Sequence, residues 1–360
     1  MMPVAAEDYD RHVQRSWTWF KKHGSPKYWL APMVGASEPS FRLLVRRYNV
    51  GMASTEMVDA GGYAHSSKYR NQFHILDERD RPLIVQIGGA NRDHLIKAAL
   101  AAVPNADAVE LNIGCPQHCA RKAKPPFGAF MMNRPEELVE TVRLLAQALE
   151  LEGSGIPLLC KIRCYSDTGD TVELCKRLER AGCAVLTVHG RTCEDAQKGT
   201  DKQAKPLADW NKISAVKQAL KIPIIGNGNI RCKADADAMI AECKVDGIMS
   251  GWGLLKNPAL FDDTAQQAQD QSTRSVDLAL QYVALCAEIE TYHVSLAKHI
   301  QKILGPKMLC KYPKICKLLQ QFASWHSNGG QELSNMDIIV DELLSVKANL
   351  AEKQSEKVYM

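Results

Sequence analysis

The sequence predicts an α/β fold, a (β/α)8 TIM barrel followed by a C-terminal all-helical domain. Eight short apolar runs rich in β-branched residues recur along the 360 residues. Segments with helical spacing separate these runs, and after the eighth run the pattern becomes helical only. The eight runs cover residues 29–35, 51–57, 83–89, 108–115, 158–164, 185–191, 223–229 and 247–253.

The segments between the runs are expected to be amphipathic helices. Apolar residues recur at helical spacing over residues 93–103, 136–149, 171–181 and 210–220. A strand, a helix and a further strand imply parallel pairing with right-handed crossovers. Continuously apolar strands suit a sheet that is covered on both faces. A barrel and a doubly wound sheet both meet these conditions.

Two features favour the barrel over the doubly wound sheet. The eight runs extend over about 225 residues, near the roughly 250 that such barrels use. A doubly wound dinucleotide-binding sheet opens with Gly-x-Gly-x-x-Gly after its first strand. Here residues 32–37 read Pro-Met-Val-Gly-Ala-Ser, which does not match.

The helical region begins after a polar segment, residues 262–274, that is expected to be a linker. From Val276 onward apolar residues form one helical stripe that ends at Gly305-Pro306, and further helices fit residues 315–325 and 336–350. The expected organisation is an N-terminal extension (1–27), a catalytic barrel (28–261), a C-terminal helical domain (262–350) and a frayed tail (351–360).

Composition excludes several classes of protein. Hydrophobic residues make up 46% and charged residues 24%, as in globular proteins, and no apolar run approaches the 18 or so residues of a membrane span. Acidic residues near the N-terminus argue against a secretory or transit peptide. The twelve cysteines include no Cys-x-x-Cys pair, so we expect free thiols in a reducing compartment and no metal site.

Glycine-rich turns and a long loop follow three of the predicted strands. Gly226–Asn229 follow the seventh strand and Gly251–Gly253 follow the eighth, where barrel enzymes commonly bind phosphate. Glycine lets backbone N–H groups approach an anion closely, so the two motifs together favour a phosphate-bearing cofactor. Residues 116–132 form a long loop after the fourth strand, and such a loop is either a functional lid or disordered.

Three polar residues within the predicted strands call for partners. Lys161 lies in an apolar run, and because an unpaired buried cation is expensive, it is expected to face an anionic or electron-rich ring. His189 ends the sixth run beside Arg191, where a functional role is as reasonable as a core hydrogen bond. Gln86 needs hydrogen-bond partners, and an isoalloxazine ring offers them.

Cys115 differs from the other cysteines by its position. It lies between Gly114 and Pro116 at the end of the fourth predicted strand, ahead of the long loop. A thiol there can exchange protons, and its reference pKa near 8.5 leaves it mostly protonated at neutral pH. This property suits a general acid, whereas a nucleophile would need a neighbouring base.

Taken together, these motifs resemble those of the tRNA-dihydrouridine synthases. The resemblance covers roughly residues 28–320 and is most specific in Asn-x-Gly-Cys-Pro (112–116) and His-Gly-Arg-Thr (189–192). Its other matches are Ala31-Pro-Met33, Gln86, Gly128-Ala129, Lys161-Ile-Arg163 and Gly226-Asn-Gly228. The segments that make it most similar to the eukaryotic type acting at tRNA positions 16 and 17 are 80–86, 181–183, 197–199, 249–250 and 257–261.

The resemblance implies an enzyme that binds FMN, takes hydride from NADPH (or NADH) and reduces the C5–C6 double bond of a uracil in the tRNA D-loop. It implies that Asn112 binds the uracil edge, and that Cys115 gives a proton to C5 after hydride reaches C6. The residues that it places around FMN are Pro32, Met33, Gln86, Lys161, His189, Asn227, Gly228, Gly251 and Trp252.

A run of lysines in the helical region independently suggests RNA binding. Six lysines and His299 fall within twenty residues that contain no acid, whereas a solvated helix face normally interleaves both signs. A local patch of this kind can bind a polyanion although the net charge is only +4. The expected RNA contacts are Arg191, Lys298, Lys302, Lys307, Lys311 and Lys314.

Two other functions are compatible with parts of the sequence. An FMN barrel oxidoreductase acting on a free dihydropyrimidine or dihydroorotate would leave the helical domain and its lysines unexplained. A non-catalytic RNA-binding protein would leave Cys115, Lys161 and His189 unexplained. The tRNA enzyme accounts for both parts, and we expect it to be a monomer in the cytoplasm and also in the nucleus.

Overall fold

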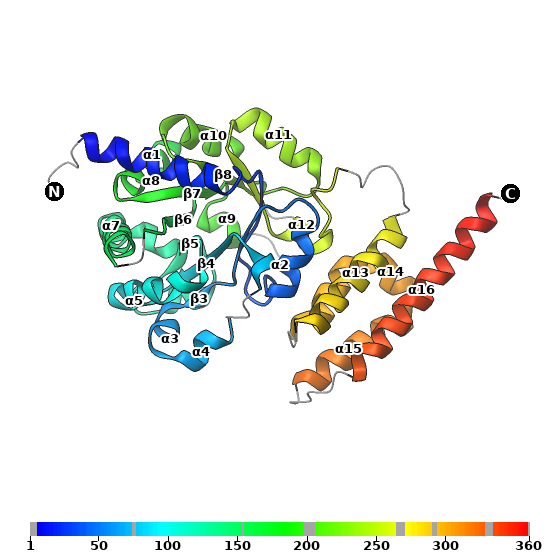
Figure 1. Cartoon of the computed structure of the whole chain (residues 1–360). Coiled ribbons are helices and arrows are strands. Elements are labelled where there is room, and N and C mark those ends of the chain that lie inside the picture. Colours follow the sequence, from blue (N-terminus) through cyan, green and yellow to red (C-terminus); the bar gives the residue numbers. More distant parts are fainter. Residues whose placement is uncertain are drawn as a thin grey trace. The chain divides into compact units, whose positions relative to one another are not determined.

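The computed structural model describes residues 6–73, 77–152, 155–197, 206–263, 271–289, 294–327 and 334–358. The chain forms two compact units, and each contains two stretches of sequence. The first unit comprises residues 1–32 and 50–250, and the second comprises residues 33–49 and 251–360 (Figure 1). The expected boundary after residue 261 lies later in the chain than this division.

The first unit contains the predicted barrel (Figure 1). Every strand pairing among the described residues is parallel, and β2 pairs with both β1 and β4, which closes the ring. Each predicted run overlaps one strand of this ring, and β1 and β7 begin one and two residues before their runs. The strands are β1 (Tyr28–Leu30), β2 (Met52–Ser54), β4 (Leu83–Gly88), β5 (Ala108–Ile113), β6 (Leu158–Arg163), β7 (Cys183–His189), β8 (Ile224–Asn227) and β9 (Gly247–Ser250). The short strand β3 (Val58–Asp59), which the sequence did not predict, pairs with β4 outside the ring.

Two layers of side chains fill the barrel. One apolar residue from each ring strand contributes to a buried cluster near the amino ends, namely Trp29, Met52, Ile84, Ala108, Leu159, Val185, Ile225 and Met249. Because side chains alternate along a strand, the residue two positions further on also points inward. On the five neighbouring strands β4 to β8 those residues are polar, and they form what we call the polar layer: Gln86, Glu110, Lys161, Thr187 and Asn227.

A helix that the sequence did not predict packs at the amino ends of the strands. It is α1 (Ala6–Lys22), within the expected N-terminal extension. The Trp19 indole donates to the Asp107 carbonyl before β5, and the Trp17 indole donates to the Lys221 carbonyl before β8. Phe20 is 2% exposed and joins the apolar cluster in the barrel, where its ring stacks on Trp29.

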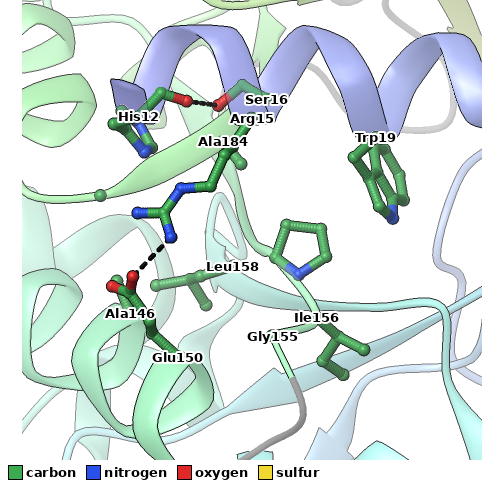
Figure 2. Close-up of a pocket in the computed structure, with 12 residues that line it drawn as sticks. His12, Arg15, Ser16, Trp19, Ala146, Glu150, Gly155, Ile156, Leu158 and Ala184 are labelled. Carbon is green, nitrogen blue, oxygen red and sulfur yellow. Dashed lines mark hydrogen bonds and ion pairs between the residues drawn. The ribbon is translucent and has the colours of Figure 1, made fainter. Parts of the chain in front are cut away.

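A cavity of about 130 Å³ lies between α1 and the amino ends of β6 and β7 (Figure 2). Its polar lining includes the ion pair of Arg15 with Glu150, at 2.5 Å, and the ring of His12, which is bonded to the Cys183 carbonyl at 3.0 Å. Barrel enzymes place their chemistry at the carboxyl ends of the strands, so this cavity lies at the opposite end from the predicted site.

The four predicted barrel helices are confirmed as α5, α7, α8 and α10. The helices of the first unit after α1 are α3 (Ala60–His65), α4 (Ser67–Asn71), α5 (Arg92–Ala102), α6 (His118–Lys122), α7 (Pro135–Leu151), α8 (Thr168–Arg180), α9 (Cys193–Gln197), α10 (Trp210–Ala219) and α11 (Lys233–Cys243). Short 3-10 turns cover Glu78–Asp80, Val103–Asn105 and Gly128–Asn133. The long loop after β5 therefore contains α6 and a 3-10 turn.

The second unit is helical, as predicted for the end of the chain. Its helices are α2 (Pro39–Arg46), α12 (Trp252–Lys256), α13 (Gln271–Glu288), α14 (Val294–Lys311), α15 (Pro313–Ser327) and α16 (Ser334–Val358). The stripe predicted from Val276 is divided between α13 and α14, and Tyr292 lies outside the described residues. Gly305, with φ of +72°, kinks α14 at the predicted stop, but helix resumes beyond it. The expected frayed tail is helical as far as Val358.

A buried polar cluster holds the second unit together. The carboxylate of Glu38 accepts from the Tyr282 hydroxyl at 2.6 Å and is paired with His299 Nε2 at 3.1 Å. Burial is the largest single influence and opposes its charge, but the charge and hydrogen bond of His299 and the bond from Tyr282 together outweigh it and lower the pKa of Glu38 to about 2. His299 is 1% exposed and stacks on Phe41, so it belongs to this core and not to the lysine surface with which the sequence grouped it.

No helix among the described residues is long and apolar enough to span a membrane.

We predict that Phe20→Ala destabilises the barrel. The substitution removes a buried ring from the apolar cluster and leaves a cavity, so the free energy of unfolding should fall by about 3–5 kcal/mol in urea titrations. Lys21→Ala, at the exposed neighbouring position, is the control and should change it by less than about 0.5 kcal/mol. Equal effects of the two variants would contradict a structural role for α1.

Candidate active site

A chain of hydrogen bonds crosses the barrel interior at the carboxyl ends of β4 and β5. Gln86 Nε2 donates to Glu110 Oε1 at 2.7 Å, and Asn112 Nδ2 donates to Gln86 Oε1 at 2.9 Å. Asn112 Oδ1 in turn accepts from the backbone N–H groups of Gly114 and Cys115, at 3.0 and 2.9 Å. The strands β4 and β5 thus fix the backbone at which Cys115 leaves the barrel.

Lys161 and Glu110 carry opposite charges into the same interior. Burial raises the pKa of Glu110 to about 7, although Lys161 and the bond from Gln86 oppose the shift. Burial likewise lowers the pKa of Lys161 to about 8, opposed by Glu110. Lys161 Nζ donates to Asn227 Oδ1 at 3.0 Å, and Asn227 Nδ2 donates to the Met249 carbonyl at 2.8 Å. The charge of Lys161 is therefore held between β5 and β8.

Cys115 carries a thiol that stays protonated near neutral pH. Its side chain is partly exposed. Burial raises its pKa above the ordinary value, although the backbone N–H of Gln117 and the charge of Arg163 act the other way. A protonated thiol can donate a proton but is a poor nucleophile. A general acid needs this state, and that role of Cys115 stays a prediction.

Gly128 explains how the long loop after β5 packs against Cys115. Ala129 N–H donates to the Cys115 carbonyl at 3.0 Å, which brings the loop back to the strand end. A Cβ on Gly128 would lie 2.6 Å from the Cys115 carbonyl oxygen and 2.9 Å from Cys115 Cβ, and its φ is +62°. Both the close approach and the backbone angle require glycine at this position.

Arg163 links Cys115 to His189. Its Nε donates to the Gly114 carbonyl at 2.7 Å, and its Nη1 lies 3.1 Å from His189 Nδ1. A guanidinium only donates, so Nδ1 accepts at this distance, while Nε2 lies farther, 3.5 Å, from Arg191 Nη1. Burial, followed by the charges of Arg163, Lys161 and Arg191, lowers the pKa of His189 well below its ordinary value. The imidazole is therefore neutral.

Arg191 and Gly228 shape the loops after β7 and β8. Arg191 Nε donates to the Pro206 carbonyl at 2.6 Å, and its Nη2 donates to Asn229 Oδ1 at 2.5 Å. Gly228 has φ of +117°, and a Cβ there would lie 2.6 Å from Ala208 Cβ and 3.6 Å from His189 Nε2. Two of the N–H donors of Arg191, which was expected to contact RNA, are therefore already hydrogen-bonded within the protein.

The predicted site residues of the first unit, apart from Pro32, lie together around the polar layer. These are Gln86, Asn112, Cys115, Lys161, His189, Asn227 and Gly228, with Arg191 beside His189. Pro32 is the last residue of the stretch that contains β1 and is partly exposed. The proposed contacts of these residues with a ligand stay predictions.

The remaining predicted cofactor residues belong to the second unit. Met33 is partly exposed, and its N–H donates to Ser37 Oγ at 3.1 Å. Gly251 precedes α12, whose first residue, Trp252, is 62% exposed. Lys302 Nζ lies 3.8 Å from the centre of the Trp252 ring, a cation–π contact. The indole thus holds one of the predicted RNA-binding lysines in place.

The other predicted RNA-binding lysines lie on α14 and α15 of the second unit. Lys298, Lys307, Lys311 and Lys314 are exposed, as a surface role requires. Lys314 is paired with Glu342 of α16 at 2.5 Å, an acid that lies outside the lysine run in sequence. Lys302 is partly buried, and burial together with the charges of Lys256 and Lys298 lowers its pKa.

Sequence reasoning assigned no role to two charged residues of this site, Glu110 and Arg163. Each lies two residues from a residue that was singled out, Glu110 before Asn112 and Arg163 after Lys161. The two-residue period of a strand places such pairs on one face, so the signal was present.

All twelve cysteines, which lie in the described ranges, are free thiols. In the described part of the chain, no group of three or more His, Cys, Asp or Glu side chains could hold a metal ion.

A closed parallel barrel with its polar groups at the carboxyl ends of the strands is the architecture of TIM-barrel enzymes. The family model described as dihydrouridine synthase (Dus) matches residues 29–352. The chain therefore belongs to the dihydrouridine synthase family, as its motifs suggested.

Curated relatives carry the name tRNA-dihydrouridine(16/17) synthase. The protein of Schizosaccharomyces pombe is 34% identical over 298 residues, which are 80% of this chain and 71% of that protein. The protein of Saccharomyces cerevisiae is 32% identical over 355 residues, 93% of this chain and 81% of that protein. The rat protein, named as similar to this synthase, is 35% identical over 287 residues. The match covers 79% of this chain but 63% of the rat protein, less than two thirds of its length.

Solved structures share the fold at low sequence identity. A 2-naphthoyl-CoA reductase in complex with 2-naphthoyl-CoA matches with a TM-score of 0.51 and 13% identity, over 65% of this chain and 49% of that one. Histamine dehydrogenase from Rhizobium sp. 4-9 matches with a TM-score of 0.51 and 11% identity, over 72% and 49%. These likenesses support the barrel and nothing finer.

We predict that Gly128→Ala moves Cys115. The added methyl group meets the Cys115 carbonyl and Cβ, so the cysteine must shift, lose some burial and become more reactive. The rate at which iodoacetamide alkylates Cys115, followed by mass spectrometry of its peptide, should rise several-fold, by about 3-fold or more.

The matched control is Gly155→Ala. Gly155 also has a positive φ, of +75°, but no atom lies within 4 Å of its added Cβ. This variant carries the backbone strain without the collision and should leave alkylation of Cys115 unchanged. A similar rate in both variants would show that Gly128 does not position Cys115.

Proposed function

We propose that this protein is an FMN-dependent tRNA-dihydrouridine synthase that reduces uridine in the D-loop, at positions 16 and 17. The observation that carries the proposal is Cys115, a protonated thiol held by Asn112 at the carboxyl end of a barrel strand. The names of the curated relatives support the same reaction and the same two positions.

The residues around the polar layer fit a flavin. Lys161, Arg163 and Arg191 bring three cations to the region around His189, and the charge of each lowers the pKa of its ring. The carboxylate of Glu110 raises the pKa of Lys161 and so favours its charged form. Such a donor set suits an electron-rich ring and would stabilise negative charge on it. Lys161 and His189 would face the ring, Gln86 its polar edge, and the backbone around Gly228 its phosphate.

Pro32, Met33, Gly251 and Trp252 complete the proposed cofactor contacts. We retain NADPH, or NADH, as the reductant, in line with the NAD(P)(+) designation of the relatives. Tight turns after barrel strands seven and eight are the usual phosphate site of this fold, which supports Gly228 and Gly251 more strongly than the indole of Trp252.

Reduction of uracil adds one hydride and one proton across the C5–C6 bond. A bound flavin would supply the hydride, and C6 is the carbon that accepts it because C6 is β to the C4 carbonyl. The enolate that results needs a proton at C5, and the Cys115 thiol donates it. The thiolate then recovers a proton from solvent. Asn112, whose side chain is held by Gln86 and by backbone N–H groups, would align the edge of the uracil.

The RNA must bring its base to the carboxyl ends of the strands. A uracil within a stacked loop cannot reach such a site, so the target base must leave its stack. We assign the phosphate contacts to the exposed lysines of the second unit and to Lys302, whose ammonium Trp252 holds. Arg191 stays a proposed substrate contact. Acting on tRNA places the enzyme, as we propose, in the cytoplasm and the nucleus, as a monomer.

The direct test of this function uses tRNA that carries no modification. Purified protein with FMN and NADPH should convert uridine at positions 16 and 17 to dihydrouridine, located by primer extension or mass spectrometry. Yellow protein that oxidises NADPH but leaves the tRNA unchanged would favour a small-molecule oxidoreductase. Colourless protein that binds tRNA and cannot be reconstituted with FMN would favour a non-catalytic RNA-binding role.

We predict that Cys115→Ala separates binding from chemistry. The variant should bind flavin and oxidise NADPH as wild type does, because the thiol serves only the proton transfer to C5. Formation of dihydrouridine should fall about 10²–10⁴-fold, the usual contribution of general acid catalysis. Cys119→Ala, an exposed cysteine of the same loop, is the control and should retain full activity. Full activity of Cys115→Ala would end the general-acid assignment.

We predict that Lys307→Glu/Lys311→Glu weakens binding of tRNA. Both lysines are exposed, and no ion pair is found for either among the described residues, so the reversal acts on the RNA and leaves Lys314 with Glu342. The slope of log affinity against log salt should become shallower by about 2.

The control for this variant is Lys68→Glu/Lys97→Glu, which makes the same change of net charge on exposed residues of the first unit. Its salt slope should equal that of wild type. Equal slopes for both double variants would mean that the lysines of α14 are only a solvated face.

A further inference from the structure

Glu110 is a buried carboxylate to which neither the motifs nor the proposed reaction gives a role. Its side chain is fully buried within the barrel. Oε1 accepts from Gln86, whereas Oε2 has no hydrogen-bond partner among the described residues. A buried charged group left half satisfied is costly, so its retention calls for an explanation.

The hydrogen bonds that start at Glu110 all run in one direction. The backbone N–H groups of Gly114 and Cys115 require the oxygen of Asn112, which turns its NH2 group toward Gln86. Gln86 must then present its own oxygen to Asn112 and its NH2 group to Glu110. An acceptor at Glu110 is what completes this order, because a donor there would face the NH2 group of Gln86.

Glu110 also acts on the charge of Lys161. Lys161 is influenced by Glu110 from β5 and by Arg163 from its own strand, and it contributes to the field at His189 of β7. Of these groups Glu110 alone is an acid, and it favours the charged form of Lys161. Glu110 in turn is faced by Lys161, by Gln86 of β4 and by the buried thiol of Cys160.

We propose that Glu110 is a positioning residue of this active site. It orders the amides of Gln86 and Asn112, and so the backbone that presents Cys115, and it keeps Lys161 charged. The ordering of the amides and the charge of Lys161 concern the protein alone, whereas the effect on catalysis rests on the proposed function. Glu110 touches neither the base nor the reacting atoms in this scheme; it acts through its neighbours.

Two variants separate the two effects. Glu110→Gln keeps an oxygen for Gln86 but removes the charge, whereas Glu110→Leu removes the acceptor as well. Glu179→Gln is the matched control, because Glu179 is also a buried carboxylate of the first unit, bonded to Tyr9 and to the backbone of Lys221 and Ile222. Flavin binding and the urea midpoint of each variant establish that it folds.

The first measurement needs no cofactor and no RNA. The alkylation rate of Cys115 should change at least about 3-fold in Glu110→Leu, because its backbone loses the ordered amides, and should stay at the wild-type value in Glu179→Gln. An unchanged alkylation rate in folded Glu110→Leu would overturn the claim that Glu110 orders the amides of Gln86 and Asn112.

The second measurement is the pH dependence of unfolding. The pKa of Glu110 is higher in the folded protein than in the unfolded chain, so the fold holds its proton more tightly. Its contribution to stability is therefore full below about pH 4.5 and is lost as the pH rises through about 7. The stability of wild type relative to Glu110→Gln should decrease over this range. A constant difference would overturn the assigned burial and charge of Glu110.

The third measurement is turnover on tRNA. Glu110→Gln should lower kcat by about 10²-fold with KM for tRNA changed by less than about 2-fold, since the variant no longer favours the charged form of Lys161 and does not touch the RNA. Wild-type activity in Glu110→Gln would overturn the catalytic part of the proposal. If wild type itself does not reduce tRNA, the proposed function fails, and the alkylation and pH measurements still decide whether Glu110 orders the site.

Discussion

The closed ring of parallel strands is the constraint on which the site depends. A ring of this size is just wide enough for side chains to fill it, and little room is left for water. An apolar layer near the amino ends meets this condition without difficulty. The polar layer above it must satisfy its hydrogen bonds internally, and it does so from strand to strand, through Gln86 to Glu110 and through Lys161 to Asn227. The functional groups are therefore held by hydrogen bonds from one strand to the next.

The same low-dielectric interior sets the protonation states. Burial moves the pKa of Glu110 upward and that of Lys161 downward, which brings two groups that normally titrate far apart close to neutral pH. At the edge of the barrel, burial keeps the Cys115 thiol protonated and the His189 ring neutral. A protonated thiol, a neutral imidazole and cationic side chains thus lie in one region, in the forms that the proposed proton transfer to carbon would use.

Local sequence patterns predicted most of the fold and part of the candidate site. All eight ring strands were predicted because each overlaps a short, mostly apolar run, and Cys115 and Lys161 were singled out by their places in two of these runs. Pairings across the fold were not predictable from one sequence. The acid that pairs with His299 is Glu38, and the acid that pairs with Lys314 is Glu342, both distant in the chain. Helix α1 was missed because its aromatic face gains meaning only against the strand ends that it covers.

Helix α1 also has a kinetic consequence. Phe20 lies among the inward side chains and fills the amino end of the barrel, and barrel enzymes take their ligands at the carboxyl ends of the strands. Under the proposed reaction, reductant and nucleic acid would have to use that entrance in turn, each leaving before the other arrives. Such alternation gives parallel lines in double-reciprocal plots and makes each partner a competitor of the other. A helix at the back of the barrel would in this way determine the order of events at its front.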